Sequence, residues 1–400
     1  MRIRITHMAH AICCVALVVT CLWLPTKSEA IPAWSRKYDM DCSSCHFGST
    51  NRLTKFGRDF LWRGQRTPDA TNIDDAEDLS WWQYMSFASK FRFEQSPDET
   101  PETRFDVEAL SIYSGGPLYE NFSYFFEIYL HERGKAATSG GGQLDTAVRS
   151  KLAEAYLQYN SNPQGENYWF ARAGSYTPRI IHTASTGGRV SISRPRILND
   201  NVGGGNLFTP RDRFYGVAFG FKTKENLFGE FGITNGGGGN ARPNIAENNE
   251  MKDIWGSLEF LFDEFGSSFG VYGYSGEFPV TGPPAFGDEF TRFGVMASLV
   301  RDNFEVSGGW FSGQNDLAAG GSRNPHGYYL EAAFLASPTT AFYGRYDFFD
   351  PDLSPEITGG AIGLSYRLNK VGRMVFEQTW SKVSGGATTN KFTFELNWMF

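Results

Sequence analysis

Two cysteines and a histidine stand close together near the start of the chain, in the run Cys42-Ser43-Ser44-Cys45-His46. In this order, two thiols can add to the vinyl groups of a porphyrin, and the adjacent imidazole can bind its iron. A thioredoxin-like redox pair or a local disulfide has the same cysteine spacing. No strand–helix unit of the thioredoxin kind surrounds the motif. We therefore predict one covalent c-type haem on Cys42 and Cys45, with His46 as the proximal iron ligand.

The first thirty residues have the features of a secretion signal. Two arginines precede an apolar stretch over residues 11–24, and small residues follow as far as Ala30, which is the order of a cleavable signal peptide. We expect cleavage after Ala30, against the alternatives of a retained anchor or a lipoprotein signal ending at Cys21. Only Cys42 and Cys45 then remain, in an oxidising compartment where such thiols are paired or modified.

The composition of the chain limits the classes of protein to which it can belong. Aromatic residues make up 16% of the 400 residues, and the formal net charge is -7. An acidic chain is a poor partner for nucleic acid. Beyond the signal there is no apolar run of the roughly twenty residues that a transmembrane helix needs. Abundant aromatics and glycines instead favour strands that alternate between lipid and water.

Strand-like alternation recurs along the rest of the chain and is clearest at its end. Outward apolar and inward polar side chains are what a lipid-embedded barrel requires. We predict an all-β fold, a transmembrane antiparallel β-barrel over residues 77–400 with about sixteen strands, fourteen being left open. A last strand ending on phenylalanine also resembles the insertion signal of bacterial outer-membrane barrels. In that strand one parity is apolar: Phe392, Phe394, Leu396, Trp398 and Phe400.

The links between the predicted strands alternate in length. Links after even-numbered strands are short, and links after odd-numbered strands are mostly long, as expected for periplasmic turns and external loops. The longest link, residues 178–212, can fold inward as a plug or constriction, or outward as a flap. Parity also assigns a set of charged side chains to the lumen, where we expect ordinary pore-lining charges: Glu108, Glu127, Glu154, Arg172, Glu230, Glu259, Arg292, Glu305, Arg345, Arg367 and Glu377.

The segment between the signal and the barrel, residues 31–76, is predicted to be a monohaem cytochrome c segment. Ser49 or Thr50 is expected to cap a short helix that reaches Arg63 and is closed by Gly64. A segment of this length is too short to enclose a haem by itself. We therefore expect the barrel to shield the haem.

The second axial ligand of the haem is not fixed by the motif. Low-spin electron-transfer haems commonly use a second His or Met. His131 shares the inward parity of its strand, and His182 lies in the long link that can enter the lumen. These two histidines are the candidate distal ligands, and Met85 and Met296 are left open.

The N-terminal region resembles a known family. The stretches that carry the resemblance are residues 31–38, the motif from Cys42 to His46, and the run LTKFGRDF over residues 53–60. They are similar to the fused outer-membrane monohaem cytochrome–porins, whose best-known members oxidise extracellular ferrous iron. The resemblance implies haem attached to Cys42 and Cys45, iron bound by His46, and a barrel that holds the haem at or inside its lumen.

These observations together predict an electron conduit in the bacterial outer membrane. A single covalent haem would accept electrons from an extracellular donor, with Fe(II) the expected one, and pass them to a periplasmic carrier. Such a protein would be an Fe(II)-oxidising oxidoreductase working by one-electron transfer. Two alternatives remain: outward export of electrons to extracellular acceptors, and a solute porin with a regulatory haem.

Overall fold

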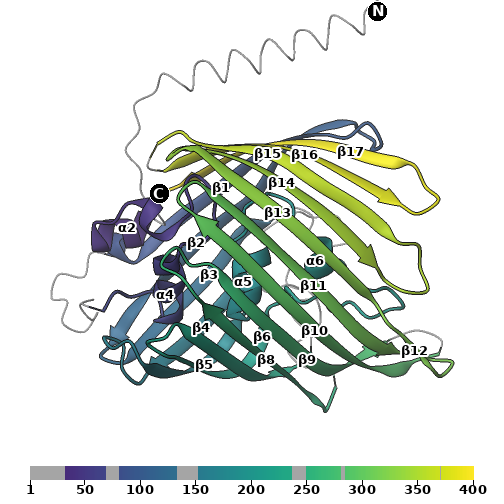
Figure 1. The fold of residues 1–400 in the computed structure, drawn as a ribbon, viewed down its shortest axis with the longest axis horizontal. Helices are drawn as coiled ribbons and strands as arrows, with labels where there is room; N and C mark the ends of the chain where they lie inside the picture. Colours follow the sequence, from purple (N-terminus) through teal and green to yellow (C-terminus); the bar gives the residue numbers. More distant parts are fainter. Residues whose placement is uncertain (1–31, 69–80, 133–151, 237–248, 281–283, 370) are drawn as a thin grey trace, which may run out of the picture.

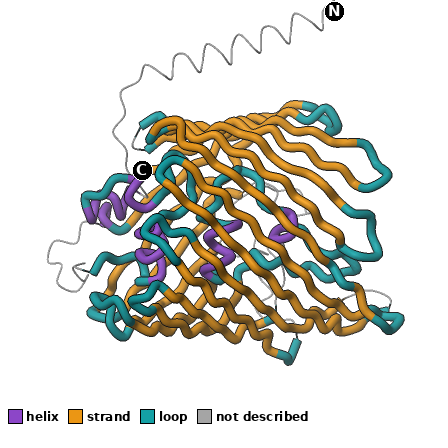
Figure 2. The backbone as a smooth tube through the Cα atoms, viewed as in Figure 1, coloured by secondary structure: helices purple, strands orange, loops and turns teal. Residues whose placement is uncertain are grey.

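The computed structural model describes residues 32–68, 81–132, 152–236, 249–280, 284–369 and 371–400. The expected signal peptide, residues 1–30, lies outside the described residues. Strands dominate the molecule and form one curved wall that closes on itself, with a few short helices at one end and in the interior (Figure 2). No helix among the described residues has the length and apolar character needed to cross a membrane.

The wall is a single antiparallel sheet. Its strands are β1 (Met85–Gln95), β2 (Thr103–Tyr119), β3 (Phe122–Glu132), β4 (Leu152–Asn160), β5 (Tyr168–Tyr176), β6 (Phe214–Lys222), β7 (Leu227–Asn235), β8 (Lys252–Leu261), β9 (Ser268–Val280), β10 (Phe286–Arg301), β11 (Phe304–Asp316), β12 (Ser322–Arg323), β13 (His326–Ser337), β14 (Thr340–Asp350), β15 (Ile357–Arg367), β16 (Gly372–Val383) and β17 (Thr388–Met399).

The first and last strands close the barrel. β1 pairs with both β2 and β17, and the register of the last pair runs from Ala88↔Met399 to Gln95↔Phe392. β12 has two residues and belongs to the hairpin between β11 and β13, which also pair directly. The wall is therefore a closed barrel of sixteen antiparallel strands, as the sequence predicts. Closure leaves no open edge whose backbone groups would lack partners in lipid.

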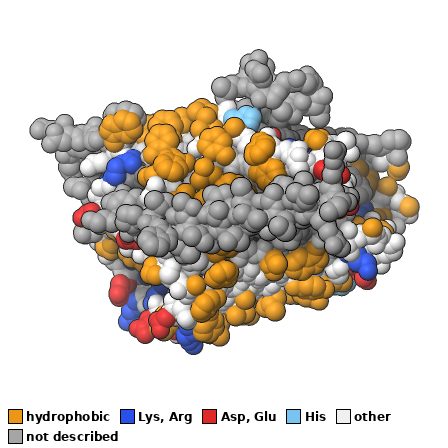
Figure 3. Space-filling model, turned by 90° about the horizontal axis from the view of Figure 1, so that it is seen from above, with side chains coloured by type: hydrophobic (Ala, Val, Ile, Leu, Met, Phe, Trp, Pro, Cys, Tyr) orange, Lys and Arg blue, Asp and Glu red, His pale blue; other side chains and the backbone are white. Residues whose placement is uncertain are grey.

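The alternation along the strands separates an apolar outside from a polar inside. Outward side chains such as Phe105, Phe231 and Leu330 are 83%, 57% and 57% exposed, and hydrophobic side chains cover much of the described wall in Figure 3. The inward parity carries buried carboxylates and arginines, Glu331 beside Leu330 among them. The barrel therefore offers an apolar surface to lipid over its outer face.

The two ends of the barrel differ. The turns after β2, β4, β6, β8, β10, β13 and β15 lie at one end, here called the short-turn end, where the start of β1 and the end of β17 also meet. Near it lie η2 (Trp81–Gln83) and three short helices, α2 (Pro32–Tyr38), α3 (Cys42–Cys45) and α4 (Lys55–Trp62) (Figure 1). We call residues 42–66 the plug, because their side chains contact many strands of the inner wall.

The link between β5 and β6 folds into the barrel. It contains α5 (Arg179–Ser185) and α6 (Arg196–Asn199), both of which lie within the ring of strands in Figure 1. Ile181 and Leu198 of these helices are fully buried, in one cluster with inward side chains of β8 to β14. Residues 177–213, here called the lumen loop, thus form the inward constriction that the sequence left open against an outward flap.

Candidate functional site

The two cysteines of the motif lie one helical turn apart. Asp41 caps α3 by accepting a hydrogen bond from the Ser43 backbone N–H at 2.9 Å, so the chain turns into the helix at Cys42. The spacing i, i+3 puts both thiols on one face of the turn. Both are buried, with Cys42 5% and Cys45 7% exposed. Burial raises the pKa of Cys45 to about 12, which keeps the thiol protonated.

His46 follows directly and is oriented by a backbone contact. Its Nδ1 lies 3.1 Å from the carbonyl oxygen of Asn51, and a ring nitrogen facing a carbonyl carries the proton. Nε2 then keeps the lone pair that binds a metal. Burial lowers the pKa of His46 to about 4, so the imidazole is neutral near pH 7. The two neighbouring thiols and this tautomer fit the requirements of a covalently attached haem with His46 on its iron.

The turn after the motif is closed onto α4. Thr54 caps α4 by accepting from the Gly57 N–H at 3.1 Å, and its hydroxyl donates to the Ser44 carbonyl at 2.7 Å. Gly57 lies so close to α3 that a Cβ there would come 2.2 Å from the Cys45 carbonyl oxygen. The position therefore requires glycine. The cap is Thr54 and not Ser49 or Thr50 as predicted, while the end at Arg63 and Gly64 agrees.

Arg52 fixes the plug to the wall on one side. Its Nε lies 2.8 Å from Glu305 of β11, and its Nη2 lies 3.1 Å from Glu331 of β13. Nη1 donates to the carbonyl of Thr183 in α5 at 2.7 Å. All three ionised side chains are buried. One guanidinium thus joins the plug, two strands and the lumen loop.

Arg58 and Trp62 fix the plug on a second side. Arg58 pairs with Glu259 of β8 at 2.9 Å, and both groups are buried. Trp62, 1% exposed, packs against Phe170 of β5 and Phe228 of β7, with ring centroids 5.5 and 4.9 Å away. These contacts place α4 across the short-turn end of the lumen.

A third side is held by β15 and β16. Ser49 and Ser365 exchange hydrogen bonds from hydroxyl to carbonyl at 2.9 and 2.8 Å. Arg373 donates to the Asn51 side chain at 2.8 Å, next to the carbonyl that orients His46. The motif is therefore carried by a segment anchored around the inner wall.

The two candidate distal ligands lie on different elements of the structure. His131 is the penultimate residue of β3, at the long-loop end, whereas the plug contacts strands near the short-turn end. His182 lies in α5 inside the barrel, and burial lowers its pKa to about 3. Its Nδ1 is buried without a hydrogen-bond partner, and Gly187 lies against its Nε2 edge. The distal ligand stays a prediction.

The charged residues assigned to the lumen by parity do face inward. Ten of them are buried, and Glu108 is half-buried beside Arg92 at 2.8 Å. They differ from the expectation in what they contact. Several bind the plug or the lumen loop, as Glu377 does by accepting from the backbone N–H groups of Ile192 and Ser193 at 2.8 and 2.9 Å.

Arg52 and Arg58 are the important residues that the sequence reasoning missed. The set of lumen charges predicted from parity contains more glutamates than arginines, and buried carboxylates require cationic partners. This surplus of glutamates was the signal that arginines from another part of the chain would enter the lumen and pair with them.

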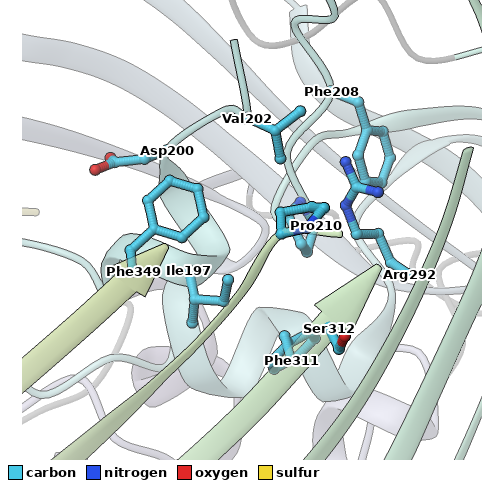
Figure 4. A pocket seen from close by; sticks show the side chains of 10 residues that line it. Ile197, Asp200, Val202, Phe208, Pro210, Arg292, Phe311, Ser312 and Phe349 are labelled. Carbon is cyan, nitrogen blue, oxygen red and sulfur yellow. The ribbon is translucent and has the colours of Figure 1, made fainter. Parts of the chain in front are cut away.

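A small cavity separates the lumen loop from β10, β11 and β14 (Figure 4). None of its lining residues belongs to the plug. Its walls are mainly apolar, with Arg292 as the cationic side chain: Ile197, Asp200, Val202, Phe208, Pro210, Arg292, Phe311, Ser312, Pro325 and Phe349.

Solved porins share this fold. The anion-selective porin from Comamonas acidovorans matches with a TM-score of 0.59 and 12% identity, over 79% of this chain and 98% of its own. The outer membrane channel DcaP of Acinetobacter baumannii gives 0.56 and 10%, over 79% and 96%. The loop L8 deletion mutant of OmpT, an outer membrane protein of Vibrio cholerae, gives 0.54 and 9%, over 79% and 98%. No protein-family model and no curated protein matches the sequence.

These similarities define the class of fold. The chain is a porin-like, closed sixteen-stranded antiparallel β-barrel.

Proposed function

We propose that this chain is an outer-membrane electron conduit, in which one c-type haem on Cys42 and Cys45 exchanges electrons with an extracellular donor and a periplasmic carrier. The observation that carries the proposal is the position of the motif. The two buried thiols and the neutral, oriented His46 lie in a segment anchored to the inner wall of a barrel. The haem supplies reversible one-electron exchange between its ferric and ferrous states.

The residues around the motif serve this role by positioning. The carbonyl of Asn51 holds the proton of His46 on Nδ1, so that Nε2 would be the atom that binds the haem iron. The barrel wall separates the site from lipid. Arg52, Arg58 and Trp62 hold the motif at the short-turn end, which faces the periplasm in barrels of this class. Fe(II) suits such a site as donor because it gives up one electron at a time.

The anchored plug favours electron transfer over solute passage. A solute needs a continuous open path, whereas an electron can cross packed protein. The plug contacts β5, β7, β8, β11, β13, β15 and β16, and the lumen loop packs against it.

The test is a titration of detergent-purified holoprotein with Fe(II), followed by the reduced haem α-band. We expect stoichiometric reduction in the wild type and its loss in His46→Ala. A matched control is His326→Ala, which changes a half-exposed histidine at the long-loop end. A haem that dithionite reduces but Fe(II) does not would overturn the iron-oxidising function and leave outward export as the next reading to test.

A second candidate is a solute porin with a regulatory haem. The observation that favours it is the set of similar structures, which includes an anion-selective porin. In planar bilayers such a protein would conduct ions with the plug in place, and its conductance would change between the ferric and ferrous forms. A conduit would conduct little in either redox state.

A further inference from the structure

Four arginines of the lumen loop lack the carboxylate partners that Arg52, Arg58 and Arg345 have inside the barrel. Arg52, Arg58 and Arg345 pair with buried carboxylates at 2.8 to 2.9 Å. Within the described part of the chain, no ion pair involves Arg179, Arg189, Arg194 or Arg211. Arg179 is held instead by the Tyr156 hydroxyl and the Gln158 side-chain oxygen, at 3.1 and 3.3 Å, which leaves Arg189, Arg194 and Arg211.

Backbone carbonyls hold two of these side chains in place. Arg189, which is 8% exposed, donates from Nε to the Ile192 carbonyl at 3.1 Å and from Nη1 to the Thr186 carbonyl at 2.5 Å. Arg194 donates from Nε to the Ser185 carbonyl at 3.0 Å. Carbonyls orient a guanidinium but carry no full negative charge, so both groups keep unneutralised charge inside the barrel.

Arg211 has a hydrogen-bond donor without an acceptor. The Nε of Arg211 is buried and has no hydrogen-bond partner. Asp212 offsets part of its charge, but the oxygens of Asp212 accept from the backbone and hydroxyl of Thr209, both at 2.9 Å. A buried donor without a partner costs about 1–3 kcal/mol and indicates a missing acceptor.

The positive charges of Arg189, Arg194 and Arg211 lie close enough to repel one another. Burial and the charges of Arg189 and Arg211 lower the pKa of Arg194 well below its usual value. Other carboxylates nearby are already engaged. Glu127 accepts from Tyr113 and lies 3.4 Å from Arg213, and Glu377 accepts from the lumen loop backbone.

The lumen loop meets the plug beside this cluster, because Val190, which follows Arg189, shares a buried apolar cluster with Phe47, which follows His46. The charge of Arg189 acts on Arg373, which in turn acts on His46. At the other end, Arg213 acts on both Arg194 and His182. His46, His182 and Arg194 are only half-buried although they belong to the plug and the lumen loop, so they keep surface that a further group can cover.

We propose that Arg189, Arg194 and Arg211 form a carboxylate-binding site inside the barrel, and that they hold the two propionate groups of the haem. This inference rests on the proposed function, because it needs a haem on Cys42 and Cys45. Guanidinium groups bind carboxylates through paired, charge-assisted hydrogen bonds. A propionate would provide the acceptor that Arg211 lacks and neutralise the charge of Arg194.

The consequence for function is control of the haem potential. Cations beside the propionates favour the ferrous form over the ferric form, which carries one more positive charge. They also keep the propionates ionised, so the potential would depend little on pH near neutrality. The lumen loop, and not only the motif, would then set the driving force for electron transfer.

The experiment compares holoprotein variants Arg189→Gln, Arg194→Gln and Arg211→Gln with Arg196→Gln. Arg196 is the matched control, because it lies on the same loop but already pairs with Asp200 at 2.7 Å. Mass spectrometry first establishes covalent haem in each protein. We then expect a lower midpoint potential, with the ferrous/ferric ratio at fixed potential falling about tenfold per variant. The propionate bending modes should shift in resonance Raman spectra.

The outcomes separate this inference from the proposed function. Wild-type protein without covalent haem would overturn both. Covalent haem with unchanged potential and propionate modes in all three variants would overturn the arginine site alone. A wild-type potential that responds saturably to added formate, with unchanged propionate modes in the variants, would assign the site to a free anion and overturn the propionate assignment. Arg194→Lys keeps the charge and should restore most of the potential, which excludes a mere folding defect.

Discussion

In the barrel wall, neighbouring strands exchange backbone hydrogen bonds along their lengths, whereas the plug is held by a small number of side chains. The wall repeats one interaction many times, with apolar residues outside and polar residues inside. The plug relies on individual contacts such as Arg52 with Glu305 and Glu331. The wall should therefore tolerate most single changes, and the plug should respond strongly to a few.

The largest effect is expected from Arg52→Ala. The substitution leaves Glu305 and Glu331 buried with one cation fewer, and breaking such a buried pair costs about 3–5 kcal/mol. Amide hydrogen exchange should accelerate on the order of a hundredfold or more in residues 42–66 while the strands stay protected. Equal acceleration of amide exchange in the plug and the wall would contradict the expectation that the plug depends on single contacts and the wall does not.

A surface ion pair provides the control for this change. Arg301 lies 2.8 Å from Asp263, but its side chain is 44% exposed. Arg301→Ala should cost no more than about 1 kcal/mol, because solvent screens exposed pairs.

A change on the lipid face should affect the wall and spare the plug. Leu330 is 57% exposed in the middle of β13. Leu330→Arg places a charge in lipid, at a cost of about 2–4 kcal/mol near the bilayer midplane. The free energy of unfolding in lipid vesicles should fall by this amount, with plug exchange unchanged. Leu330→Met keeps the apolar surface and should behave like the wild type.

The smallest effect is expected at the cap of α4. Thr54→Ala removes the acceptor for the Gly57 N–H and the donor to the Ser44 carbonyl, at a cost of about 1 kcal/mol. Exchange should rise severalfold in residues 42–62 only. Thr54→Ser retains the hydroxyl and should preserve wild-type protection, and if it does not, the cap is not what stabilises this turn.

The barrel wall was predictable from the sequence because the alternation of outward and inward side chains involves only neighbouring residues. An outward residue stands next to an inward one, as Leu330 does next to Glu331, so parity alone separates the two faces. The even strand number follows from both ends of the wall lying at the short-turn end. The sixteen strands and the inward set of charges were found this way.

The plug was less predictable because its contacts join distant parts of the chain. Ser49 was expected to cap a helix, but its hydroxyl donates to the carbonyl of Ser365. Thr50 donates to the Phe47 carbonyl within its own turn. With both hydroxyls engaged, the helix begins after Thr54. The prediction of a haem site at Cys42, Cys45 and His46 needed no such information, because the motif consists of neighbouring residues, and it stays a prediction.

The pairing of β1 with β17 has a consequence for the order of biosynthesis. The strands that close the barrel are the first and the last to be made, and the plug contacts strands all around the lumen they enclose. In the closed barrel Cys42 and Cys45 are less than a tenth exposed, too little for a modifying enzyme to reach them. If the motif carries haem as proposed, attachment must therefore precede closure of the barrel, and the N-terminal segment must be modified before the wall folds around it.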